Sequence, residues 1–172
     1  MVNKDISGIL KWTDGNGNGL DCIVKFIAKL LDPTLPESSS IFVGDLIVQL
    51  VRKANNHMMP VLPQLLTAIV HRLSGAKIPS FIQSLITVFA YYIHNDLEAV
   101  LAFLSNLKIG NQDGLNVLIN IWCDNQESFH GFNAIKVSST ALAKLYMCKD
   151  ERFLSINVKG DLIATQPGSN IN

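Results

Sequence analysis

The residue types that most suggest chemistry in this chain are the acidic and amide side chains of one short glycine-rich loop. Asp14, Asn16 and Asn18 occupy the first, third and fifth positions of the EF-hand calcium-loop pattern. Gly19 supplies the glycine that the pattern requires at its sixth position. The twelfth position, which should give the metal two carboxylate oxygens, is Lys25. Because a positive charge there opposes a cation, we predict a flexible loop before a helix and no calcium site.

The histidine, cysteine and serine residues give no arrangement that is typical of a metal site or an activated nucleophile. No HExxH motif, CxxC pair, GxSxG elbow or glycine-rich phosphate loop after a strand occurs in the chain. We therefore expect no catalytic, cofactor-binding or metal-binding residue and no enzyme activity, and the partner-binding residues stay unassigned. The alternative is a helical enzyme that assembles its site from scattered glutamate, histidine and cysteine side chains. The histidines and cysteines in question are His57, His71, His94, His130, Cys22, Cys123 and Cys148.

The composition limits the classes of partner. The 172 residues carry no net charge, and 48% are hydrophobic while only 16% are charged. This balance supports a core and gives no electrostatic sign of nucleic-acid or membrane binding. One uncharged stretch, residues 78–95, has nearly the length of a membrane span. Polar side chains recur on one side of it, at Ser80, Gln83, Ser84 and Thr87. That one-sided pattern predicts a helix packed against protein rather than lipid.

A helical pattern of apolar residues repeats along the chain. Its first set comprises Leu46, Ile47 and Leu50, then Leu85, Ile86 and Phe89, then Leu118, Ile119 and Trp122. An interleaved set comprises Phe26, Ile27 and Leu30, then Leu65, Leu66 and Ile69, then Val100, Leu101 and Leu104. Two alternating amphipathic helices with a combined period of roughly 35–40 residues are typical of a HEAT or armadillo-type solenoid. Such a fold offers a long surface for partners rather than a pocket for catalysis.

The expected fold is therefore all-α, a right-handed superhelical stack of about three to four HEAT-type helical hairpins. We expect a leading helix and three hairpins, with helices over residues 20–31, 41–54, 59–73, 79–93, 97–107, 114–123 and 132–147. The solenoid should span residues 20–163. A loop or poorly ordered lead-in should occupy residues 1–19 and a disordered tail residues 164–172. Phe129 and Phe132 should form a hydrophobic staple at the start of the last helix.

Several blocks of the sequence resemble the C-terminal half of importin-beta-type nuclear transport receptors, and the importin-nine branch in particular. The blocks are residues 78–107 and 121–146, in the same order as in that family, with residues 30–54 and 158–163 fitting as well. The resemblance implies a late HEAT-repeat segment of a karyopherin, which carries protein cargo through nuclear pores under control of the GTPase Ran. It further implies core histones, ribosomal proteins and the TATA-binding protein as cargoes, and nuclear pore proteins as partners. The implied location is the cytoplasm and nucleus, with no direct nucleic-acid binding and no membrane insertion.

The resemblance also implies which helices would face cargo. In such hairpins the second helix lines the concave side, here residues 59–73, 97–107 and 132–147. Their exposed side chains should be mixed in charge, with no acidic stripe for a basic cargo. These side chains are His71, Arg72, Glu98, Asn106, Lys136 and Lys144. Two alternatives remain: another HEAT-repeat interaction scaffold, of the phosphatase regulatory or vesicle-coat type, and a membrane-embedded bundle around residues 78–95.

Overall fold

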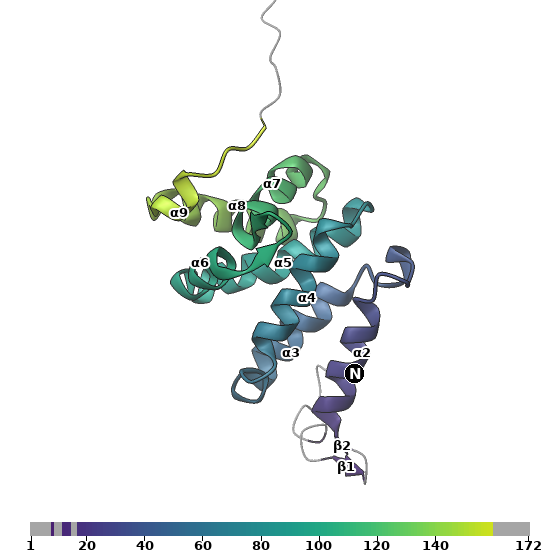
Figure 1. Ribbon diagram of the computed structural model, residues 1–172. Coiled ribbons are helices and arrows are strands. Elements are labelled where there is room, and N and C mark those ends of the chain that lie inside the picture. The colour runs from purple at the N-terminus through teal and green to yellow at the C-terminus, as the bar shows by residue number, and fades with distance from the viewer. Residues whose placement is uncertain (1–7, 9–11, 15–16, 160–172) are drawn as a thin grey trace, which may run out of the picture.

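The computed structural model describes residues 8, 12–14 and 17–159, which fold into a stack of helices (Figure 1). The tail expected at 164–172, the end of the expected solenoid at 160–163 and most of the lead-in expected at 1–19 lie outside the described residues. The longer helices are α2 (Gly19–Leu30), α3 (Val43–Met58), α4 (Leu62–Ser74), α5 (Pro79–Asn95), α6 (Leu97–Asn106), α7 (Gly114–Asn125) and α8 (Phe132–Met147). They confirm all the helices predicted from the sequence, to within a few residues at each end.

Short elements connect the long helices. Two antiparallel pairs of two-residue strands are present, β1 (Thr13–Asp14) with β2 (Gly17–Asn18) and β3 (Lys108–Ile109) with β4 (Gln112–Asp113). Two 3-10 turns, Glu37–Ser39 and Gln126–Ser128, and a short helix α9 (Glu151–Leu154) complete the described chain. The turn between β3 and β4 depends on Gly110, whose φ of 59° suits glycine better than any other residue. The sequence did not predict these short elements.

Side-chain caps explain where several helices begin. Asn18 accepts a hydrogen bond from the Asp21 backbone N–H at 2.9 Å, and the Asp21 carboxylate accepts one from the Asn18 N–H at 3.4 Å. This reciprocal pair is a capping box, so Asn18, which looked like a calcium ligand, begins α2 instead. Asp96 caps α6 by a single bond, because its side chain accepts a hydrogen bond from the Ala99 N–H at 3.0 Å. Pro79 occupies the first turn of α5, where a missing N–H costs nothing.

The helix α5 lies at the centre of the stack (Figure 1). It packs against α3 on one side and α8 on the other, so these three helices form one layer. Helix α7 packs against α4, α5 and α6. The expected pairing of 114–123 with 132–147 as a third hairpin is therefore wrong, and so is the expected place of α8 among the second helices. The repeating apolar pattern in the sequence predicts which residues are buried, but not which helix covers them.

The approach of α3 to α5 is close enough to require a glycine. A Cβ atom at Gly44 would overlap the carbonyl oxygen of Ser84 on α5. The Ser84 Oγ accepts a hydrogen bond from the Gly44 N–H at 2.8 Å in the buried contact. Helix α3 has no side-chain cap at Phe42, its own N-cap position. Ser84 therefore satisfies one of the unpaired amides of the first turn of α3 from a neighbouring helix.

Directional contacts also fix α8. The Lys144 Nζ donates to the backbone oxygens of Ile93 and His94 at 3.0 and 3.1 Å, so a cation from α8 caps the C-terminal end of α5. From α7, the buried indole N–H of Trp122 donates to Ser138 Oγ at 2.8 Å. This bond ties α7 to α8 inside an otherwise apolar core.

The predicted apolar stripes form most of the core. Phe26 is the clear exception among them, and Arg72, which lies outside the stripes, is unexpectedly buried. Nearly all residues of the stripes are buried, among them Trp122, Phe89 and Ile47. Phe26, however, is 55% exposed, because α2 makes few contacts with the rest of the described chain. Arg72, expected on the surface, is only 8% exposed. Its guanidinium donates to the Leu35 oxygen at 3.1 Å and lies 5.0 Å from the centre of the Phe81 ring.

The stretch that raised the question of a membrane span is the protein-packed helix α5. Among the described residues, no helix has both the length and the hydrophobicity that crossing a bilayer requires.

Candidate protein-binding surface

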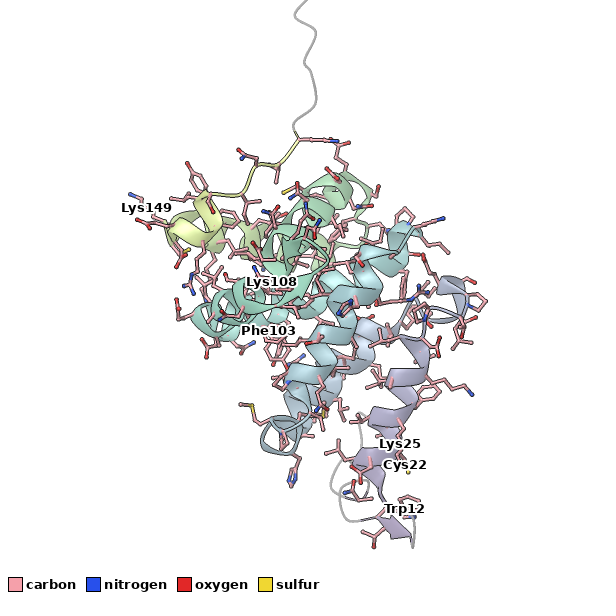
Figure 2. All side chains as sticks on the ribbon, in the orientation of Figure 1. Trp12, Cys22, Lys25, Phe103, Lys108 and Lys149 are labelled. Carbon is pink, nitrogen blue, oxygen red and sulfur yellow. The ribbon has the colours of Figure 1, made fainter. Side chains whose placement is uncertain are left out.

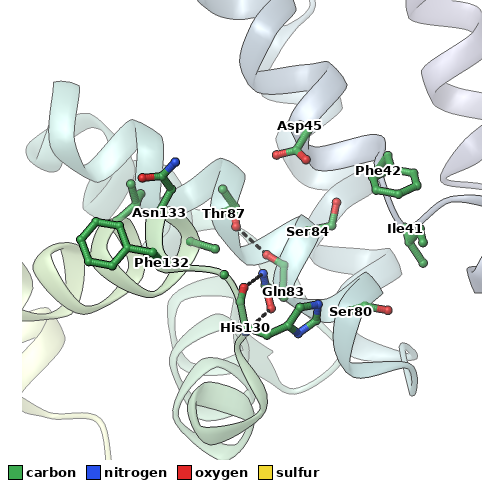
Figure 3. Close-up of a pocket in the computed structure, with 13 residues that line it drawn as sticks. Ile41, Phe42, Asp45, Ser80, Gln83, Ser84, Thr87, His130, Phe132 and Asn133 are labelled. Atoms are coloured by element: carbon green, nitrogen blue, oxygen red, sulfur yellow. Dashed lines mark hydrogen bonds between the residues drawn. The ribbon is translucent and has the colours of Figure 1, made fainter.

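One hollow in the helix stack lies between the N-terminal parts of α3, α5 and α8 (Figure 3). This first hollow has a volume of about 670 Å³. Helix α5 supplies its floor, and the beginnings of α3 and α8 supply its walls. Its lining residues include Phe42 and Asp45 from the α3 side, Ser80, Gln83, Ser84 and Thr87 from α5, and His130, Phe132 and Asn133 from the α8 side.

Hydrogen bonds within the protein already occupy much of the polar floor of the first hollow. The Gln83 amide makes two bonds to the main chain of His130, with Nε2 donating to the carbonyl oxygen at 2.9 Å and Oε1 accepting from the N–H at 3.0 Å. Thr87 donates to the Gln83 carbonyl at 2.8 Å, and Ser84 holds Gly44 as described above. Figure 3 shows the Gln83 bonds joining α5 to the loop before α8. Two residues of the polar stripe predicted on this helix, Gln83 and Ser84, therefore hold the loop before α8 and the start of α3 against α5.

Two phenylalanine rings border the first hollow from opposite walls. Phe42 is 72% exposed and Phe132 is 80% exposed. The hydrophobic staple expected between Phe129 and Phe132 is not formed, because Phe129 is buried and Phe132 points to the surface. Gly131, with a φ of 87°, turns the chain between them and separates the two rings. Exposed aromatic rings beside a concave surface are typical of protein contact sites.

The second hollow lies at the other end of α5, between the start of α4 and helix α6. It has a volume of about 360 Å³. Its lining is mostly apolar and comprises Met59, Leu62, Pro63, Leu66, Tyr92, Asn95, Asp96, Ala99, Val100 and Phe103. A small polar hollow of about 130 Å³ lies next to it, and is lined by Val51, Arg52, Tyr91, Tyr92 and Asn95. Tyr92 and Asn95 belong to both.

Tyr92 is the most unusual polar residue of this region. Its hydroxyl is shielded from solvent and has no hydrogen-bond partner among the described residues. Burial raises the pKa of Tyr92 well above its ordinary value, so the phenol keeps its proton. A solitary buried hydroxyl leaves no pattern in a sequence, because it depends on the packing of three helices.

The structure does not gather the scattered histidines and cysteines into a site. His57, His71, His94 and His130 are all exposed. Burial raises the pKa of the Cys123 thiol, with the nearby charge of Asp124 acting in the same direction, which disfavours the reactive thiolate. Cys22 is exposed on α2, and no group of three potential metal ligands occurs within the described ranges.

The calcium-like loop is only partly described, since residues 15 and 16 lie outside the described ranges. Its described backbone forms the strand pair β1 and β2, and Asn18 caps α2. Lys25, at the position that would need a carboxylate, lies on α2 beside Cys22 and is exposed (Figure 2). Nothing in the described loop supplies the missing ligand.

Of the side chains expected to face cargo, most are exposed but they do not share one face. Arg72 is buried, as noted above. Glu98 on α6 accepts both hydrogen bonds of the Arg152 Nη2 at 2.8 Å, an exposed contact that ties α9 to α6. Lys144 binds the end of α5 and Lys136 lies on α8, in the layer of α3 and α5. His71 on α4 and Asn106 on α6 are exposed as predicted, and the Asn106 amide donates to the Ala102 carbonyl of its own helix at 2.8 Å.

Comparisons with known proteins point to one group of relatives. No protein-family model matches the chain. It is 32% identical over 167 residues to importin subunit beta-5 of Schizosaccharomyces pombe, which covers 95% of this chain and 16% of that protein. It is 30% identical over 141 residues to importin subunit beta-5 of Saccharomyces cerevisiae, covering 82% of this chain and 14% of that protein. Importin-9 of Drosophila melanogaster is 28% identical over 151 residues, covering 84% and 15%. The chain thus spans about one sixth of the length of these relatives.

Proposed function

The chain is homologous to importins of the importin-beta family, and on that premise we propose that it is a segment of a nuclear transport receptor. The observation that carries the proposal is the similarity to importin subunit beta-5 across 95% of the chain. The helical-repeat architecture supports it, because such stacks act through extended binding surfaces. Transport receptors work by binding rather than by chemistry, which agrees with the surface described above.

We propose that the partners are those of an importin-nine-type receptor. These are protein cargoes such as core histones, ribosomal proteins and the TATA-binding protein, the GTPase Ran, and nuclear pore proteins. The receptor would shuttle between cytoplasm and nucleus. Within it, residues 20–163 would form a late part of the helical stack. The exposed apolar side chains of α8, among them Ile135 and Tyr146, would then pack against the next repeat.

A second candidate function uses the same fold with other partners. A phosphatase regulatory or vesicle-coat scaffold would also present stacked helices and exposed aromatic rings. Dependence on Ran separates the two, because only a transport receptor should exchange cargo for the GTP-bound form.

A binding experiment with purified components tests the proposal. The matching stretch of the Schizosaccharomyces pombe importin subunit beta-5 would be replaced by this chain, and the chimera immobilised with a labelled core histone. We expect GTP-loaded Ran to release the histone, and GDP-loaded Ran to leave it bound. The unaltered receptor serves as the positive control. A chimera that unfolds cooperatively but binds neither histone nor Ran would contradict the proposal.

A further inference from the structure

We propose that the second hollow and the small polar hollow beside it form one two-part site for a partner segment that carries an acidic residue next to a large apolar one. This inference rests on the proposed role as a protein-binding segment and names the chemistry of one partner. The two hollows share Tyr92 and Asn95, so neighbouring side chains of one peptide can reach both.

The apolar part of the site exists because of the way the helices stack. Helix α7, and not α6, packs closely against α4. The space between the start of α4 and the face of α6 is therefore left open. Leu62 and Leu66 line it from α4, and Val100 and Phe103 line it from α6. Figure 2 shows Phe103 on α6.

The size and lining of this space suit a large apolar side chain. Its volume of about 360 Å³ falls within the range of ligand pockets, roughly 300–1,000 Å³. Met59, at its rim, is 58% exposed. A methionine can adjust its shape to an incoming group at little cost. Burying an apolar side chain here would remove both surfaces from water, which is the main source of affinity at such sites.

The polar part of the site offers a cation. Arg52 lies on α3, is exposed, and makes no hydrogen bond or ion pair with the described residues. A guanidinium group binds a carboxylate through two parallel hydrogen bonds, a geometry that a lysine cannot match. The Asn95 side-chain oxygen accepts no hydrogen bond from the described residues, while its amide donates to the Tyr91 carbonyl at 2.7 Å. The free hydrogen-bonding capacity of this part is therefore centred on Arg52.

The Tyr92 hydroxyl adds a second donor at the junction of the two parts. It is buried and has no partner among the described residues. A bound segment that displaces the neighbouring side chains would bring a carboxylate or carbonyl oxygen to it, and so supply an acceptor that the described residues do not provide. A ligand that brings an acceptor is thus favoured over one that brings only apolar atoms.

One acidic group also lines the apolar part, and it must be weighed against Arg52. Asp96 caps α6, since its Oδ1 accepts from the Ala99 N–H at 3.0 Å. The N-terminal end of a helix carries a partial positive charge, which offsets this carboxylate. The positive charge of Arg52 is not offset in this way. The balance therefore favours a partner with an acidic residue, and a partner with a basic residue becomes the competing outcome.

Fluorescence anisotropy with three labelled nine-residue peptides tests the assignment on the full 172-residue chain. Each peptide has a central pair flanked by glycine and serine: Glu–Leu, Lys–Leu or Glu–Ser. We expect the Glu–Leu peptide to bind at least about tenfold more tightly than the other two. Equal binding of all three peptides, or no binding by any, would overturn the proposal. Tighter binding of the Lys–Leu peptide would overturn it in favour of a basic partner held by Asp96.

Two substitutions locate the binding. Ala99→Trp places a large ring in the apolar part, and should weaken Glu–Leu binding at least tenfold. Arg52→Glu should reverse the preference, so that the Lys–Leu peptide becomes the tighter ligand. Lys25→Glu, on the distant helix α2, is the matched control and should change nothing. Both test positions are exposed, so a melting curve like that of the parent chain is expected. If the preference persists in Arg52→Glu, the assignment of the polar part is wrong.

The outcomes separate this inference from the proposed function. If the peptides bind without preference but GTP-loaded Ran still releases the histone, the two-part site is contradicted and the proposed transport role is not. A clear peptide preference without any response to Ran would instead count against the transport role.

Discussion

The two hollows at either end of α5 differ in how the protein uses their polar groups. In the first hollow, Gln83 and Ser84 are engaged with the backbone of the loop before α8 and of α3, and the rings of Phe42 and Phe132 are exposed. In the second, the Tyr92 hydroxyl has no partner among the described residues and the lining is mostly apolar. The difference shows that the polar groups of the first hollow hold α3 and α8 against α5, while the Tyr92 hydroxyl beside the second keeps hydrogen-bonding capacity that the described residues do not use.

The largest expected effect comes from the close contact beside the first hollow. Gly44→Ala should lower the free energy of unfolding by about 3 kcal/mol, because the new methyl group overlaps the Ser84 carbonyl and pushes α3 from α5. Urea unfolding followed by circular dichroism measures it. Gly75→Ala is the control, since a Cβ there meets nothing within 4 Å and its φ of −111° suits any residue. Equal stability of the two variants would show that the α3–α5 contact is looser than described.

A smaller effect is expected when the bond between α5 and α8 is removed. Gln83→Ala deletes both hydrogen bonds to the main chain of His130, and should lower the free energy of unfolding by about 1–2 kcal/mol. Gln64→Ala, on the exposed surface of α4, is the matched control for the change in side chain. If the two glutamine variants unfold at the same urea concentration, the polar floor of the first hollow does not hold α8.

Removing a polar group at the second hollow should not lower the free energy of unfolding, in contrast to the first hollow. Tyr92→Phe removes a buried hydroxyl that has no partner among the described residues, so the free energy of unfolding should stay unchanged or rise by up to about 1 kcal/mol. The same variant should bind the Glu–Leu peptide less tightly, because a donor is lost. Tyr146→Phe, at a position 71% exposed, provides the comparison. A clear loss of stability in Tyr92→Phe would mean that its hydroxyl has an acceptor after all, and the contrast between the hollows would fail.

The smallest effect on stability is expected at the rim of the first hollow. Phe42→Ala and Phe132→Ala should each change the free energy of unfolding by less than about 0.5 kcal/mol, because both rings are mostly in water. If the rings contact partner proteins, the double variant should reduce histone binding by the chimera without changing its melting temperature. Normal binding by a well-folded double variant would restrict partner contacts to other parts of the stack.

The sequence predicted the helices well because the signals for them are local. The apolar spacing, Pro79 and the capping residues Asn18 and Asp96 act within a few residues of each boundary. The short strands β3 and β4 escaped prediction, since two residues are too few to show an alternating pattern.

The neighbours of each helix could not be predicted in the same way. Arg72 was expected in solvent, yet the loop containing Leu35 covers it, and that contact joins residues far apart in the chain. Phe26 was expected in the core, yet α2 has few neighbours among the described residues. The polar stripe of α5 indicated a protein-packed helix, but not that Ser84 would cap α3. Both hollows arise from such long-range packing, so neither could be predicted from the sequence.

The most direct test of the central claim, that this chain is a functional segment of a nuclear transport receptor, is an import assay. The chimera of the Schizosaccharomyces pombe receptor would carry a fluorescent core histone into the nuclei of permeabilised cells, with GTP and Ran supplied. We expect nuclear accumulation close to that with the unaltered receptor, and its loss when the chimera carries Gly44→Ala. A chimera that folds as stably as the receptor but leaves the histone outside the nuclei would contradict the claim.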